Sequence, residues 1–226
     1  MQRRTLPTAI ALTATTAFLL TACGGGGDDS TSHDKATGAD SGSATPSASP
    51  TSSVSPSSSS SSADGIVRPK VTLPADVHNV YEGWTSNDPA EAAALADAKR
   101  RIEATDAAIT GDDLNSEAIP FYYTGDALLG AARWIKGYTD DDYTVTGTTR
   151  FYNPQLTKYS TSAIGLIYCS DEGKAFDKNR KTGKVEKTAV TKNSYVFYNT
   201  RLDKNKNGIW QTSKLIGMRG EEKCTP

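Results

Sequence analysis

Residues 143–152 have the sequence YTVTGTTRFY, and this stretch decides the fold because the sequence pattern changes here. β-branched and aromatic residues dominate it, as they do in strands. Three further segments of the same character follow at residues 158–169, 185–202 and 209–218, separated by turn-forming sequences at 153–154, 177–183 and 203–208. The four segments predict an antiparallel sheet of about four strands.

The segment before residue 143 has a helical pattern instead. Asn87-Asp88-Pro89 is a capping residue followed by proline, and apolar residues then recur at helical spacing as far as Ala108. A second helix is predicted to begin at 124–126 and to end near Gly137, while residues 67–80 are expected to form an extended lead-in. Helices followed by strands predict an α+β domain, with N-terminal helices packed on one face of a curved antiparallel sheet.

The first 22 residues predict a signal peptide. A short basic region precedes an apolar run at 6–20 that is too brief to span a bilayer permanently. The run closes with LTAC at 20–23, which resembles the lipobox of bacterial lipoproteins. That resemblance implies cleavage before Cys23 and a diacylglyceryl group on its thiol, so the membrane would be a partner through this lipid anchor. We expect the chain at the outer face of the cytoplasmic membrane, the alternative being an ordinary secretory signal that happens to contain a cysteine.

The rest of the chain divides by composition. Residues 23–63 begin with the lipidated Cys23 and then consist almost entirely of Ser, Thr, Gly, Pro, Ala and Asp, a composition that predicts a disordered tether. Residues 64–226 hold all 3 tryptophans and all 10 tyrosines, which suits a single globular domain. With Cys23 consumed by lipid, Cys169 and Cys224 remain in an oxidising compartment, and we expect them to form a disulfide.

Charge is distributed unevenly within the predicted domain. Residues 64–142 carry 7 basic and 15 acidic side chains, whereas residues 143–226 carry 15 basic and 7 acidic ones. Such asymmetry can indicate a face that binds a polyanion, but because both halves belong to one domain we favour attraction between its layers and solvated edges. We expect no nucleic-acid partner.

Motifs that could carry catalysis are weak. The sequence DKNKNG at 203–208 matches the first half of a calcium-binding loop, but Lys214 stands where the bidentate Glu belongs, so a hairpin turn is favoured. Asp171-Glu172 is interpreted as a solvated strand end, and His78 lies in the lead-in. We therefore expect no catalytic residue, no metal and no cofactor.

An aromatic set offers a possible ligand site. Aromatic side chains are frequent where large aliphatics are few, and a subset could line a pocket between helix and sheet and stack on a sugar or an apolar molecule. The alternative is that all of them belong to the core. The candidate pocket residues are Trp134, Tyr138, Tyr168, Tyr195 and Trp210.

Two resemblances follow from longer stretches. Residues 195–202 (YVFYNTRL), a charged turn and 208–212 (GIWQT) resemble the last hairpin of the nuclear-transport-factor-two-like, cystatin-like cone fold. The stretches at 73–77, 147–152, 168–172 and 181–184, together with the terminal cysteine, resemble a group of actinobacterial, Streptomyces-type secreted lipoproteins without an assigned activity. The resemblance implies a cone domain but no particular chemistry.

Three functions are therefore expected, in order of preference. The first is a non-enzymatic binding or assembly module of the cell envelope, with an envelope protein or a cell-wall polymer as partner. The second is a cone that binds a small ligand in the aromatic pocket. The third is an isomerase or hydrolase, which a buried carboxylate of raised pKa facing a cavity would favour.

Overall fold

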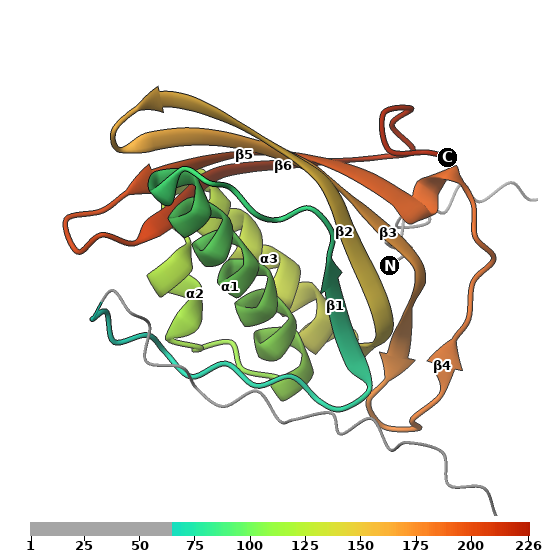
Figure 1. Ribbon diagram of the computed structural model, residues 1–226. Helices are drawn as coiled ribbons and strands as arrows, with labels where there is room; N and C mark the ends of the chain where they lie inside the picture. The colour runs from blue at the N-terminus through green and yellow to red at the C-terminus, as the bar shows by residue number, and fades with distance from the viewer. Residues whose placement is uncertain (1–64) are drawn as a thin grey trace, which may run out of the picture. The chain divides into compact units, whose positions relative to one another are not determined.

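The structure, a computed structural model, describes residues 65–226 (Figure 1). The predicted signal peptide (1–22) and the tether with Cys23 (23–63) lie outside the described residues. In chain order the helices and strands are β1 (Val77–Tyr81), α1 (Pro89–Gly111), α2 (Ala118–Tyr122), α3 (Gly125–Asp140), β2 (Tyr143–Ser160), β3 (Ala163–Asn179), β4 (Val185–Glu186), β5 (Tyr195–Lys204) and β6 (Trp210–Arg219). A single 3-10 turn, Lys192–Ser194, precedes β5.

The predicted α+β class is confirmed, with three helices grouped on one face of a curved sheet (Figure 1). The sheet has six strands rather than about four, in the order β1-β2-β3-β5-β6, with the two-residue β4 paired to β3. The strands missing from the prediction are short, and one of them comes from the proline-containing lead-in. β1 runs parallel to β2, and all other neighbours are antiparallel.

The prediction of a turn at Asn153-Pro154 is wrong, because β2 continues through these two residues to Ser160. Asn153 adopts a positive φ of 52°, and the register between β2 and β3 shifts between Tyr152 and Gln155. Pro154 has no N–H to donate to the ladder, so it is tolerated at this bulge. The hairpin turn lies instead at residues 161–162, between the two long strands.

The helices begin where local chemistry predicts. The Asp88 side chain accepts hydrogen bonds from the backbone N–H groups of Ala90 (3.0 Å) and Glu91 (3.1 Å), and Pro89 occupies the first turn of α1. Capping of this kind satisfies donors that have no partner within the helix. It fixes the start of α1, the helix that carries most of the polar residues described below. Among residues 65–226, no helix is both long and apolar enough to cross a membrane.

The two faces of the sheet have different roles. Tyr168 faces the helices, where it packs in a cluster with Trp84, Leu166 and other buried side chains. The next residue, Cys169, belongs to a separate cluster with Phe197 and Cys224, because successive strand residues point to opposite faces. Cys169 and Cys224 form a disulfide with their Cα atoms 5.6 Å apart, which fastens the C-terminal segment to the face away from the helices.

Candidate ligand cavity

A cavity of about 270 Å³ lies between the helices and the sheet. Helices α1 and α3 and strands β2, β3, β5 and β6 all contribute to its wall. The side chains and backbone that line it belong to Arg101, Ile102, Thr105, Asp106, Tyr123, Asp126, Ala127, Gly130, Ala131, Trp134, Thr149, Phe151, Tyr168, Glu172, Tyr198, Leu215 and Gly217. Aromatic and apolar groups thus share the cavity with four charged residues.

Small residues keep the cavity open. Helix α3 presents Ala127, Gly130 and Ala131 to it, residues that recur at helical spacing on one face. A Cβ atom added at Gly130 would meet no heavy atom within 4 Å. Gly217 on β6 also lines the cavity, but a Cβ atom there would meet the Tyr198 ring at 3.1 Å. The open space on this side of the cavity therefore results from the small residues of α3.

A bulge in β6 decides which of its residues reach the cavity. The register between β5 and β6 shifts between Arg201 and Leu202, so that Leu202 pairs with Thr212 and Arg201 with Lys214. Before the bulge Thr212 is buried in the core, and after it Leu215 and Gly217 line the cavity. An extra residue in a strand reverses which side chains face the core.

Arg101 is buried in the wall of the cavity, with 4% of its surface exposed. It donates hydrogen bonds to the hydroxyl oxygens of Tyr168 (2.7 Å) and Tyr123 (3.3 Å). The Tyr123 hydroxyl also exchanges a hydrogen bond with Thr105, one turn further along α1, at 2.8 Å. Three hydroxyl groups are thereby organised around one guanidinium.

Asp106 lies next to this group on α1 and faces the same cavity. Asn79 of β1 donates a hydrogen bond from Nδ2 to Oδ2 of Asp106 at 2.7 Å. The pKa of Asp106 is raised to about 7, chiefly because burial disfavours the charged carboxylate. The negative charges of Glu172 and Glu103 act in the same direction, whereas the Asn79 hydrogen bond and the charge of Arg101 oppose the rise. A carboxyl with this pKa can give up or accept a proton near neutral pH.

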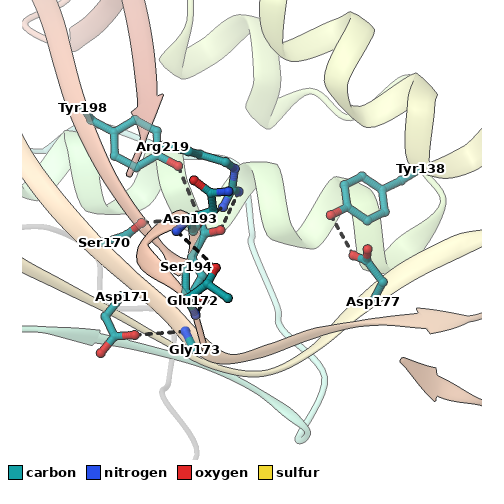
Figure 2. Close-up of polar contacts among 11 residues, drawn as sticks. Tyr138, Ser170, Asp171, Glu172, Gly173, Asp177, Asn193, Ser194, Tyr198 and Arg219 are labelled. Atoms are coloured by element: carbon teal, nitrogen blue, oxygen red, sulfur yellow. Dashed lines mark hydrogen bonds and ion pairs between the residues drawn. The ribbon is translucent and has the colours of Figure 1, made fainter. Parts of the chain in front are cut away.

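Glu172 is the second carboxyl in the wall and differs from the solvated strand end that the sequence suggested. It is buried, with 5% of its surface exposed, and Arg219 donates to its Oε2 at 2.6 Å. Ser170 and Tyr198 direct their hydroxyls at Oε1, at 3.3 and 3.4 Å (Figure 2). Asp171 points to the other face of the strand, where it contacts Arg150. Glu172 is therefore held ionically and by hydrogen bonds in one position.

The structure divides the five aromatic candidates among different places. Trp134 and Tyr168 line the cavity. Tyr138 lies with Trp134 in a smaller cavity of about 160 Å³, where its hydroxyl donates to Asp177 at 3.0 Å (Figure 2). Tyr195 packs near the disulfide on the opposite face of the sheet, and Trp210 is buried in the core with 1% of its surface exposed.

The sequence prediction did not include Arg101 and Asp106, and it assigned Glu172 to a solvated strand end rather than to the cavity. A signal for Arg101 exists in the sequence, because this residue falls on the buried face of α1, between Ala98 and Ala104. A charged residue at such a position must be paired or functional. Asp106 and Glu172 carry no comparable local signal, since their burial depends on strands distant in sequence.

Other motifs have structural roles. Asn205 in the 203–208 turn accepts hydrogen bonds from the backbone N–H groups of Asn207 (2.9 Å) and Ile209 (3.0 Å), as an Asx turn does. His78 is exposed on β1. Within the described part of the chain, no three His, Cys, Asp or Glu side chains are grouped so that they could hold a metal ion.

Comparisons with known proteins give similarity of fold alone. No protein-family model matches the chain, and no curated protein matches it. The intermembrane space region of the chloroplast protein ARC6 is similar at 7% identity and a TM-score of 0.40, over 56% of this chain and 94% of that one. A ketosteroid isomerase-like protein from Erwinia carotovora atroseptica is similar at 16% identity and a TM-score of 0.36, over 59% and 98% of the two chains. Hexachlorocyclohexane dehydrochlorinase LinA-type3 from Novosphingobium barchaimii is similar at 13% identity and a TM-score of 0.36, over 56% and 88%.

Proposed function

We propose that this chain is a lipid-anchored extracytoplasmic protein that binds a small molecule in the cavity between α1, α3 and the sheet. The observation that carries the ligand-binding part is the lining of the cavity. Aromatic side chains and oriented polar groups converge on one space of about 270 Å³, and such a combination is typical of ligand sites. The anchoring part rests on the lipobox-like sequence at 20–23.

This proposal gives the second of the expected functions preference over an assembly module. An interface with an envelope protein or a wall polymer needs a complementary outer surface, whereas the features described above lie inside the domain. The tether would let the domain take up its ligand at a distance from the membrane.

Substitution at Gly130 tests the ligand-binding proposal. A leucine at this position would project into open space in the cavity wall, because nothing lies within 4 Å of its Cβ. Gly111→Leu is the matched control, since Gly111 is an exposed helical glycine with equally open surroundings that does not line the cavity. Native mass spectrometry of the full-length protein extracted from its own membrane would give the mass and occupancy of a bound small molecule. We expect Gly130→Leu to lose it and Gly111→Leu to keep it, and equal occupancy in both variants would contradict the proposal.

A second candidate function, proton transfer to or from the bound molecule, is favoured by Asp106. The pKa of about 7 suits a general acid or base, and the Arg101–Tyr168 hydrogen bond could stabilise an oxyanion formed at the same time. Deuterium incorporation next to the carbonyl of indanone, followed by proton NMR, would measure this activity. Asp106→Asn should abolish the incorporation. An unchanged rate of deuterium incorporation in this variant would contradict a catalytic role for Asp106.

A further inference from the structure

Arg101 is buried, and its partners differ from those of the partly buried Arg68 and Arg219. Arg68 pairs with Asp97 at 3.3 Å, and Arg219 pairs with Glu172 at 2.6 Å. Within residues 65–226, no carboxylate oxygen lies within 4.0 Å of the Arg101 guanidinium, whose hydrogen-bond partners are tyrosine hydroxyls. Its Nε–H is buried and has no hydrogen-bond partner among the described residues.

The positive charge of a buried arginine without a carboxylate partner is poorly compensated. Taking a guanidinium out of water is energetically unfavourable, and hydrogen bonds to neutral hydroxyl groups offset only part of that cost. Folded proteins therefore pair buried arginines with carboxylates, and this domain pairs even the partly buried Arg68 and Arg219 in this way. Because Arg101 lines the cavity, an anion that enters the cavity can approach the Arg101 guanidinium.

The other charged groups around the cavity leave this positive charge in place. Glu172 on β3 is engaged by Arg219, and Asp126 on α3 is exposed. Asp106 is held by Asn79 of β1, and its carboxyl binds a proton up to about neutral pH. The residues that β2, β5 and β6 contribute to the lining carry no charge.

We infer that Arg101 is the anion anchor of the cavity and that the ligand is a small monocarboxylate with an apolar or aromatic body. This inference rests on the proposed ligand-binding function. One unpaired guanidinium suits a single negative charge, whereas a phosphate dianion would require further cations that the lining does not supply. Ile102, Phe151 and Trp134 provide the apolar wall for the body. The cavity of about 270 Å³ is slightly smaller than those that hold drug-sized molecules.

Two probes with the same apolar body, one charged and one neutral, test the inference. Phenylbutyrate carries a carboxylate, and phenylbutanol is its neutral counterpart of nearly the same shape. Calorimetry with the full-length protein should show that phenylbutyrate binds at least tenfold more tightly, because a hydrogen bond between a guanidinium and a carboxylate is stronger than one to a neutral hydroxyl. Arg101→Met should remove this preference for the carboxylate. Arg101→Lys, which keeps the charge and loses the planar fork, should retain part of it.

Arg100→Met is the matched control, since Arg100 is the next residue on α1 but pairs with Asp97 and does not line the cavity. It should leave both affinities unchanged. Equal affinity of the wild-type protein for the two probes would overturn the inference and spare the proposed function. Absence of binding of either probe, with no small-molecule mass in the native spectrum, would overturn both. If Arg101→Met does not fold, as judged by near-ultraviolet circular dichroism, the wild-type preference and Arg101→Lys decide the question.

Discussion

The carboxyl of Asp106 should make the stability of this domain depend on pH in a way that one substitution removes. Its pKa rises from 3.8 to about 7 on folding, chiefly because burial disfavours the charged form. Between these two values the folded state keeps a proton that the unfolded state has released. The free energy of unfolding therefore falls as the pH rises through this window, and above pH 7 the loss is complete.

The magnitude follows from the size of the pKa difference. It is about three pH units, and each unit corresponds to about 1.4 kcal/mol, so the ionised carboxyl costs the folded state about 4 kcal/mol at most. Asp106→Asn removes the ionisable group and keeps an acceptor for the Asn79 side chain. The variant should match the wild type near pH 4 and become several kcal/mol more stable near pH 8.

Urea unfolding of both proteins at pH 4, 6 and 8, followed by tryptophan fluorescence, would measure this difference. Asp113→Asn removes an exposed carboxylate at the end of α1 and controls for the change in net charge. A stability gain that is the same at all three pH values would refute the assignment of a buried titrating carboxyl at position 106. A variant less stable than the wild type at pH 8 would refute it more strongly.

Three further outcomes are expected. Cys169→Ser with Cys224→Ser should lower the free energy of unfolding by about 4 kcal/mol, because the disulfide closes a loop of 55 residues; a loss under about 1 kcal/mol in urea unfolding would contradict this. Leu166→Ala should cost about 2–5 kcal/mol, since the side chain is fully buried, and an unchanged unfolding midpoint would contradict its place in the core. Phenylbutyrate binding should weaken about tenfold between pH 6 and pH 8, when Asp106 gains a negative charge near the anion, while phenylbutanol binding should stay constant in calorimetry.

The parts of the fold that local chemistry controls were predictable. Asp88 and Pro89 mark the start of α1, and the α+β order follows from the change of pattern at Tyr143. Asn153-Pro154 shows the limit of such signals. The same two residues favour a turn or a bulge, and the choice depends on whether the strand has a partner beyond them, which β3 provides here.

The aromatic candidates show the same limit on the sheet. Tyr195 and Tyr198 lie on one strand, three residues apart, so they point to opposite faces. Tyr198 pairs with Tyr168 and lines the cavity, whereas Tyr195 lies with the disulfide on the other face. The sequence contains this alternation, but a strand's register is needed to assign each face to the helices or to the C-terminal segment.

The features that define the candidate site all reduce the stability of the empty domain. Arg101 is a buried cation without a carboxylate partner among the described residues. Asp106 has a carboxyl group whose pKa is raised by burial, so its charged form is disfavoured. Both lie on α1 and face the cavity that Gly130 helps to keep open. Selection for stability alone would have filled the cavity and paired the arginine. A bound carboxylate would offset the cost of Arg101 directly, so the same residue that destabilises the empty protein would give the ligand its affinity, and ligand binding should raise the free energy of unfolding accordingly.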